Sequence, residues 1–419
     1  MYRIKTILLL ACLALMPAFL SAQNNTNSPY SRYAYGVLSD QTFGSQRAMG
    51  GIGIGLRDSK MINPLNPAAF SSVDSMTFML DFGITGQLGW FEDNGKKESK
   101  YNGNLEYIAM QFPLSKNMGM GLGLKPISYV GYGYGAVESI SDTYQKYTSY
   151  TGSGGLSQIY GSLSYNFFKR FSVGVNLGYI FGDIKHSRNV TSNDADDMVT
   201  NLSDTLRVNG LSYDLGIQYT HRLDDNSTLV IGATYAPKTG FNGKDMRTGM
   251  TYSSSTGVIS EVSRKVIQNQ GFQLPQSIGV GATYNKPNKL TVGADFLMQQ
   301  WADAEYEGKT DTLNNRLKFN AGMEYTPDSR SKSIFKRTKY RVGTYYSDSY
   351  AKVQGSGYKE YGISAGFGIP MVDDRSRINL AFQYVAIRPE MKTLIDEQYF
   401  RFTVSYTFNE LWFFKRKIQ

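Results

Sequence analysis

Apolar and polar side chains alternate with a period of two along most of the chain after about residue 75. In residues 75–91, one face would carry Phe78, Leu80, Phe82, Ile84, Leu88 and Trp90, and the other Thr77, Asp81, Gly83, Thr85, Gln87 and Gly89. Successive side chains of a strand point to opposite faces, so this pattern predicts strands with one apolar face and one polar or small face. The pattern recurs in residues 171–181, 211–219, 290–298, 361–369 and 400–408.

Fourteen segments of this kind follow one another. They are residues 76–91, 104–115, 117–129, 157–168, 171–184, 208–221, 227–237, 271–285, 288–301, 314–326, 338–347, 358–370, 377–388 and 397–409. Short links, such as Ser115-Lys116 and Lys169-Arg170, alternate with long links rich in Ser, Gly, Asp and Tyr. Bacterial outer-membrane barrels have an even number of strands, short periplasmic turns and long external loops. The chain is therefore predicted to be all-β: a transmembrane antiparallel β-barrel of about 14 strands, with residues 130–156, 185–207 and 238–270 as external loops.

Composition favours a membrane barrel over its alternatives. The mean hydropathy is -0.34, and no segment beyond the first 22 residues reaches the roughly 18 apolar residues of a membrane helix. Aromatic residues make up 14% of the chain and gather near the expected strand ends, as interfacial girdles require. The candidates are Phe112, Phe167, Phe171, Tyr284, Tyr325 and Phe408 at one end and Trp90, Phe91, Tyr179, Phe181 and Trp301 at the other. A soluble β-sandwich would have shorter strands and no alternation of short and long links.

The first 22 residues have the features of a secretory signal peptide. Arg3 and Lys5 precede an apolar run, and Ala22 is a small residue suited to cleavage. The lone cysteine, Cys12, lies in this segment, so the stability of the mature chain would not rest on disulfides. We expect a signal peptide at 1–22, an N-terminal plug (hatch) segment at 23–74, the barrel at 75–409 and a tail at 410–419. Both termini would be periplasmic, with the barrel in the bacterial outer membrane.

Residues 23–74 do not follow the strand pattern and are rich in residues that shape the backbone. Their motif residues are Gly50, Gly51, Gly53, Gly55, Asn63, Pro64, Asn66, Pro67 and Ala68. The glycines permit tight or positive-φ conformations, and each Asn-Pro fixes a turn. A compact plug in the lumen would use these residues. A phosphate-binding glycine loop is the alternative, but it would need a strand, a helix and a βαβ unit that the sequence lacks.

The order of signal peptide, Arg47-Ala48-Met49-Gly50-Gly51, Asn66-Pro67-Ala68 and fourteen strands resembles the FadL-type outer-membrane transporters of hydrophobic compounds. The resemblance covers nearly the whole mature chain in architecture, and its specific part lies in residues 44–70. It implies a plugged barrel that takes hydrophobic ligands from outside and releases them sideways beside a kinked strand. In the third expected strand, the lateral-gate candidates are Gly119, Gly121, Gly123 and Pro126. The alternative is that Pro126 lies near a strand end, where pairing is slack.

Expected inward positions include the charged residues Asp81, Lys125, Asp214, Asp295, Lys318, Glu324 and Arg341. Such charges need partners, either in networks with the plug and one another or along a wet passage. The strands offer no dedicated apolar pocket, so we take ligand-contact candidates from the expected loops and their edges: Tyr129, Tyr132, Tyr134, Phe241 and Tyr252. Tyrosines there could equally form a surface for protein contacts.

Two functions follow as hypotheses. The first is passive uptake of hydrophobic, fatty-acid-like small molecules with lateral release. The second is a structural or accessory barrel subunit of an outer-membrane protein assembly or secretion complex. Expected partners are outer-membrane lipid, hydrophobic small molecules and other outer-membrane or periplasmic proteins. We expect no enzyme, metal or cofactor, because His186 and His221 are the only histidines and neither has a serine–acid setting. The formal charge of +9 is scattered, so no nucleic-acid site is expected.

Overall fold

The computed structural model describes residues 26–93, 95–194, 197–253, 255–371 and 375–412. The expected signal peptide, and most of the expected tail, lie outside the described residues. The strands of the wall are β2 (Thr77–Asp93), β3 (Lys96–Pro113), β4 (Met118–Ser139), β5 (Gln145–Phe167), β6 (Phe171–Ser192), β7 (Met198–Asp224), β8 (Ser227–Ala236), β9 (Thr239–Ser253), β10 (Ile259–Leu274), β11 (Ser277–Lys286), β12 (Leu290–Gln299), β13 (Arg316–Tyr325), β14 (Lys339–Asp348), β15 (Tyr358–Pro370), β16 (Arg377–Pro389) and β17 (Asp396–Leu411). No helix in these ranges has both the length and the apolar character needed to cross a membrane.

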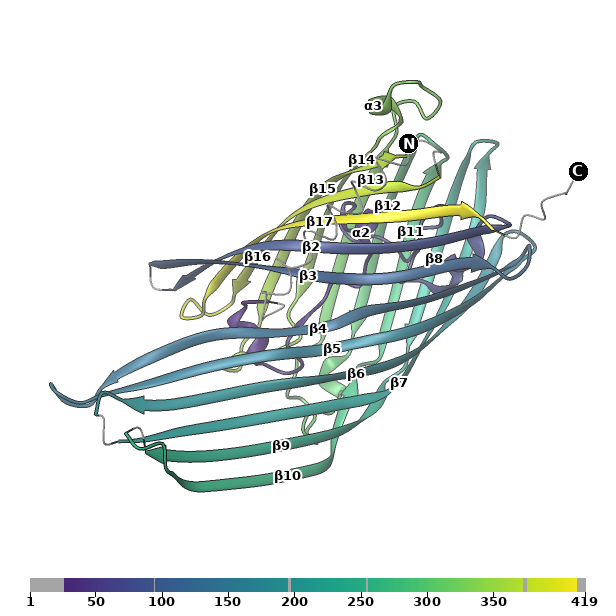
Figure 1. The fold of residues 1–419 in the computed structure, drawn as a ribbon. Helices are drawn as coiled ribbons and strands as arrows, with labels where there is room; N and C mark the ends of the chain where they lie inside the picture. Colours follow the sequence, from purple (N-terminus) through teal and green to yellow (C-terminus); the bar gives the residue numbers. More distant parts are fainter. Residues whose placement is uncertain (1–25, 94, 195–196, 254, 372–374, 413–419) are drawn as a thin grey trace, which may run out of the picture.

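The strands form one closed antiparallel sheet. Sequential neighbours pair along the wall, and β17 pairs with β2 to close it (Figure 1). β8 and β9 make one wall strand that is interrupted at Pro237, because both pair with β7. β10 and β11 make another, interrupted at Pro275, since they pair with β9 and β8 respectively. Counted in this way the wall has fourteen strands, which confirms the predicted antiparallel barrel.

The alternation in the sequence sets the two faces of the wall. On β6, Leu177 and Tyr179 point away from the lumen and are exposed, whereas Ser172 and Asn176 point inward and are buried. β2 repeats the pattern, with Leu88 outside and neighbouring small or polar residues inside. Exposed apolar side chains outside and buried polar side chains inside suit a wall surrounded by lipid.

The wall is much taller on one side. β4, β5, β6 and β7 contain 22, 23, 22 and 27 residues, whereas β12, β13 and β14 contain 10 each. About 10 tilted residues cross a membrane, so the long strands, with β9 and β10, continue roughly 40 Å along the strand direction past the short ones. We call this six-stranded extension the projection; it contains the described parts of residues 131–153, 184–207 and 244–266 (Figure 1).

The expectation of long external loops is therefore wrong for most of residues 130–156, 185–207 and 238–270. These residues continue the barrel strands as paired ladders. Their Ser, Thr, Gly and Tyr content is typical of a loop when one segment is considered alone, but here cross-strand hydrogen bonds satisfy the backbone. Outside lipid neither face of the sheet must be apolar, so the alternation that marks a membrane strand is absent.

Residues 26–76, which we call the inner segment, are bonded inside the barrel. They contain η1 (Pro29–Arg32), β1 (Val37–Leu38), α2 (Gly44–Arg47) and η2 (Pro67–Ser72). Two short helices lie elsewhere: η3 (Trp301–Asp303) and α3 (Ile334–Arg337). Phe43 and Phe70 of the inner segment pack with Tyr107 and Tyr160 of the wall in a buried apolar cluster. The inner segment therefore occupies part of the lumen of the barrel.

Candidate functional site

The turn at Asn66-Pro67 joins the inner segment to the wall through the Asn66 side chain. Its side-chain Nδ2 donates to the carbonyls of Ile54 at 2.8 Å and Ile217 at 3.1 Å. Its Oδ1 accepts from the N–H of Ala68 at 3.0 Å and so caps η2. Pro67 follows as the first residue of η2, where its missing N–H costs nothing. Asn66 is completely buried, and its bonds to Ile54 and Ala68 are buried with it.

The preceding Asn-Pro pair, Asn63-Pro64, organises the inner segment itself. Asn63 Nδ2 donates to the carbonyls of Gly53 at 2.6 Å and Leu56 at 2.9 Å, and its Oδ1 accepts from Gln46 Nε2 at 2.8 Å. The next residue, Pro64, borders the central cavity described below. Asn63 therefore folds the glycine-rich stretch back on the α2 turn.

The glycine-rich stretch meets an acidic side chain of the wall. Asp295 on β12 accepts from the N–H groups of Gly53 at 2.5 Å and Ile54 at 2.8 Å. Gly50 and Gly51 adopt φ values of +65° and +81°, which side chains rarely tolerate. A Cβ on Gly50 would also collide with the backbone of Thr344. The glycines therefore allow the chain to lie directly against the strands.

Glycines in the wall complete this close approach. A Cβ on Gly119 or Gly121 of β4 would collide with Phe70, and one on Gly216 of β7 would collide with Pro67. A Cβ on Gly123 would collide with the Tyr160 ring. Three of the lateral-gate candidates thus have a packing use in the described structure, while their part in gating stays a prediction.

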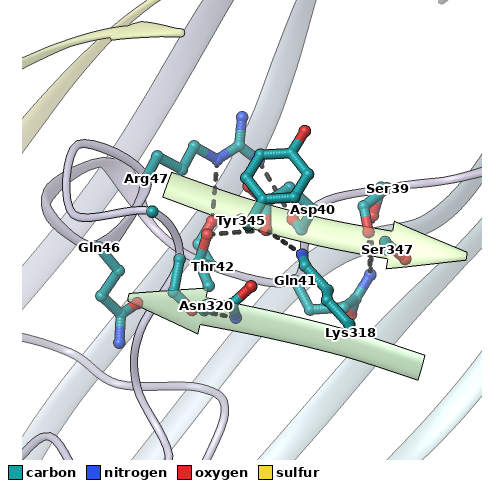
Figure 2. A network of polar contacts seen from close by, with 12 residues as sticks. Ser39, Asp40, Gln41, Thr42, Gln46, Arg47, Lys318, Asn320, Tyr345 and Ser347 are labelled. Carbon is teal, nitrogen blue, oxygen red and sulfur yellow. Dashed lines mark hydrogen bonds and ion pairs between the residues drawn. The ribbon is translucent and has the colours of Figure 1, made fainter. Parts of the chain in front are cut away.

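A buried ion pair links the inner segment to β3. Arg47 Nη2 lies 2.8 Å from Glu106 Oε2, and the two side chains are 3% and 5% exposed. Arg47 Nε also donates to the Thr42 carbonyl at 3.0 Å (Figure 2). Opposite, Asp40 Oδ1 lies 3.8 Å from Lys318 Nζ of β13. Burial raises the pKa of the Asp40 carboxyl, but Lys318 and Arg47 outweigh that effect and hold the pKa at about 2.

Other predicted inward charges also form networks. Glu324 Oε2 accepts from Arg341 Nε at 2.7 Å, and Glu324 Oε1 lies 2.5 Å from Lys339 Nζ. Lys339 in turn lies 3.5 Å from Asp58 of the inner segment. Of the two alternatives for the inward charges, these groups follow the first: they pair with one another and with residues 23–74. In the part of the chain that the structure describes, no three metal-ligating side chains converge.

The β3–β4 ladder ends early and leaves an opening in the wall. Pairing runs from Pro113↔Gly119 to Ile108↔Leu124 and stops there. A cavity of about 130 Å³ follows, bordered by Leu105, Tyr107, Lys125, Pro126 and Tyr129 among others. The candidate Pro126 thus lies where the two strands separate, next to a bulge in the β4–β5 ladder.

A side-chain hydrogen bond between Tyr129 and Glu106 spans this opening. Tyr129 of β4 donates from its hydroxyl to Glu106 Oε2 of β3 at 3.0 Å, the same oxygen that Arg47 contacts. The side of β4 that faces the opening also carries β1, through Val37↔Tyr129 and Leu38↔Ser128. Tyr129 was a ligand-contact candidate, and the structure places it instead in a contact that ties β4, β3 and the inner segment together.

An apolar cluster closes the lumen at the projecting end. Its members come from the inner segment, the tall strands and the two loops that follow β12 and β14: Tyr35, Val130, Tyr132, Leu156, Ile180, Ile184, Leu206, Val208, Phe241, Phe272, Trp301, Ala304, Leu313, Tyr350 and Ala351. Tyr350 donates to the Gly36 carbonyl at 2.5 Å, and Tyr306 donates to the Ala34 carbonyl at 3.1 Å. Trp301, expected in an outer girdle, is 1% exposed because η3 turns it inward. Phe91 is likewise buried, against Tyr399.

The five ligand-contact candidates do not converge on one pocket. Tyr132 and Phe241 belong to the closing cluster, and Tyr129 lies in the β3–β4 opening. Tyr134 is 37% exposed on the inner face of the projection, and Tyr252 lies near the far end of β9, paired with Val199. These residues all belong to strands, so the sheet holds them apart.

Beneath the closing cluster lies a central cavity of about 210 Å³. It is bordered by the inner segment and inward residues of the wall, including Leu38, Ile54, Leu65, Lys125, Asp214 and Lys318. The cavity extends to the wall beside Pro237 and Pro275, where β8 and β10 end. Its border mixes apolar side chains with charges of both signs, and its volume is below the range of about 300–1,000 Å³ typical of ligand pockets.

Fold and site together define a closed antiparallel β-barrel with fourteen strands around a bonded N-terminal segment, the fold that FadL-type barrels share. A family model described as BamG matches residues 3–419. The chain therefore belongs to the BamG family.

Solved structures show the same fold. The P. putida toluene transporter TodX is 15% identical, covers 90% of this chain and 100% of its own, and has a TM-score of 0.62. A Pseudomonas aeruginosa FadL homologue is 13% identical, with coverages of 89% and 99% and a TM-score of 0.59. CymD, a monoaromatic hydrocarbon channel, is 14% identical, with coverages of 87% and 97% and a TM-score of 0.59. No curated protein matches the chain.

Proposed function

We propose that this chain is an interaction barrel of the outer membrane, a membrane-anchored subunit that joins a larger outer-membrane protein assembly. The projection carries this proposal. Its concave face, which continues the lumen wall, presents Tyr134, Tyr150 and Arg188; Arg32 of η1 lies 4.5 Å from the Tyr150 ring centroid. Tyrosine and arginine are enriched at protein interfaces and their hot spots. We place the projection outside the cell and both termini in the periplasm.

The interior gives independent support. The closing cluster blocks the projecting end with large buried side chains, and hydrogen bonds and ion pairs hold the inner segment against several strands. The central cavity is small and charged, which does not suit a hydrophobic ligand. A sealed barrel can anchor a partner without a continuous path through its lumen.

A matched pair of double variants tests the proposal. Tyr134→Ala with Arg188→Ala removes large side chains from the concave face, whereas Tyr147→Ala with Arg264→Ala removes the same residue types from the convex face. Each tagged protein would be extracted from native outer membranes in mild detergent, and the proteins bound to it would be quantified by mass spectrometry.

We expect wild type and the convex variant to carry a stoichiometric protein partner and the concave variant to lose about tenfold or more of it. Heat resistance in detergent checks that all three barrels are folded. A wild-type barrel extracted without any protein partner would overturn the proposal.

Passive uptake of hydrophobic, fatty-acid-like molecules is the second candidate. The β3–β4 opening beside Pro126 favours it, because a ligand in the lumen could leave sideways there into lipid. The solved neighbours described as a toluene transporter and a monoaromatic hydrocarbon channel share the fold. Lateral release by this chain would require movement of the Tyr129–Glu106 contact that spans the opening.

Uptake of a fluorescent long-chain fatty acid by cells or proteoliposomes tests this candidate. The double variant Pro126→Val with Gly123→Val should abolish lateral release. Because a side chain at position 123 would also displace Tyr160, the single variant Pro126→Val shows the effect of the proline alone. Unchanged uptake in both variants would contradict the gate. Wild-type uptake equal to that of protein-free liposomes would contradict transport itself.

A further inference from the structure

The part of β4 that lies in the projection has one edge without a neighbouring strand. β4 pairs with β5 along its whole length, up to Ser139↔Gln145. On its other side, β3 leaves at Leu124 and β1 pairs only with Ser128 and Tyr129. From Gly131 to Ser139 the second edge of β4 therefore has no strand beside it among the described residues.

The direction of the backbone groups follows from their bonds. The N–H of Gly131 donates to Ser31 Oγ at 3.1 Å, and the carbonyl of Gly133 accepts from Lys100 Nζ at 3.4 Å, both on the side away from β5. In an antiparallel strand the outward N–H and C=O pairs recur at every second residue. Gly135, Val137 and Ser139 thus present theirs on the same edge, with no bond to another described residue there.

The edge is unprotected compared with the other free edges of the wall. Natural sheets guard their edges with charges, proline, bulges or short strands. The open edge of β10 carries Glu261, Arg264 and Lys265. The beginning of β3, which does not pair with β4, carries four charged residues at 96–100. The segment 131–139 of β4, with the sequence GYGYGAVES, contains one charge and no proline.

The chain itself already adds a strand at this edge. β1 pairs antiparallel with β4 just below the free part, and the Ser39 N–H extends this contact to the Ile127 carbonyl at 2.9 Å. The same edge would accept a further strand beyond Gly131 and Gly133, whose backbone groups already bond to Ser31 and Lys100. Strand addition to an exposed edge is a general mode of peptide recognition.

We propose that the free part of this edge, residues 134–139 of β4, binds an extended segment of a partner protein by β-strand addition. This inference rests on the proposed interaction role and names the place where the partner binds. On the convex face Gly133 and Gly135 leave space beside the edge for bulky apolar side chains, next to Val137, which is 61% exposed. On the concave face Arg32 has no ion pair with any described residue, so it suits an acidic side chain of the added strand.

Photo-crosslinking in native membranes tests the register of this contact. Gly135, Val137 and Ser139 would be replaced singly by p-benzoylphenylalanine, and the attachment sites would be mapped by mass spectrometry. We expect attachment to one partner polypeptide, at sites that step by about two residues along it in a fixed direction. Attachment only to lipid, to a second copy, to the same chain, or to sites without this order would overturn the inference.

A substitution pair tests the hydrogen bonds. Val137→Pro removes the edge N–H that an added strand needs, whereas Val137→Thr keeps it and remains a good strand former. We expect Val137→Pro to lower the crosslink yield from position 135 at least tenfold and Val137→Thr to change it less than twofold, with heat resistance unchanged in both. If the proline variant keeps its crosslinks and its stoichiometric partner, strand addition is wrong and the interaction role stands. If the wild type is extracted alone, both are wrong.

Discussion

The Asn66 side chain should decide whether the inner segment stays bonded to the wall. Asn66→Ala removes three hydrogen bonds, to Ile54, Ile217 and Ala68. Each contributes about 1 kcal/mol net. The Ile54 carbonyl keeps a bond from Gln218 Nε2 at 3.1 Å, whereas the N–H of Ala68 loses the Asn66 side chain that caps it. We therefore expect a local cost of about 3 kcal/mol. At about 1.4 kcal/mol per tenfold, the segment should open about 100 times more often.

Hydrogen–deuterium exchange of the detergent-solubilised barrel measures this opening directly. Peptides that cover residues 53–70 should exchange about 100-fold faster in Asn66→Ala, while those of β13 to β16 should keep their rates. Asn242→Ala is the matched control, because Asn242 is exposed and its side chain has no hydrogen bond in the described structure. Exchange less than threefold faster in Asn66→Ala would refute the reasoning. Replacement of both Asn66 and Pro67 by alanine should also increase leakage of small solutes through reconstituted barrels.

Three further predictions concern the same assembly. Arg47→Met leaves the buried Glu106 carboxylate without its cation, which should destabilise the fold by about 3–5 kcal/mol. The unfolding temperature on a heat-modifiability gel should fall accordingly, and an unchanged temperature would contradict the ion pair. The Asp40 pKa is about 2 against an ordinary 3.8, so its stabilisation, about 2 kcal/mol, is complete above pH 4 and is lost as pH falls through 2. Thermal unfolding between pH 5 and pH 2 should show this loss in wild type and not in Asp40→Asn, and equal slopes would count against it. Gly216→Val should speed exchange of the inner segment because its side chain meets Pro67, whereas Gly240→Val, which faces open space, should not; equal rates would dismiss the steric account.

The barrel was predictable because period-two alternation is a local signal that each membrane strand must repeat. The paired charges were predictable in kind, since a buried Asp295 or Lys318 needs a partner wherever it lies. Their actual partners were not, because the Asp295 contact joins residues 242 positions apart in the chain. The close fit of Gly119 against Phe70 was hidden for the same reason.

The projection was missed because its strands lie outside the pattern that membranes impose. Residues 131–135 alternate glycine and tyrosine, which are compatible with both a loop and a strand, and only pairing with β5 makes them a strand. Trp301 was misplaced because an aromatic residue at a strand end suits a girdle equally well if the chain does not turn inward there. The Tyr129–Glu106 contact depends on the bulge at Glu106, which a single sequence does not reveal.

Native mass spectrometry of the protein extracted from its own outer membrane in mild detergent tests the interaction role most directly. The account predicts one barrel with a protein partner in fixed stoichiometry, and no apolar small molecule retained in the lumen. A lone barrel that carries fatty acids or other hydrophobic molecules would contradict the account and favour transport.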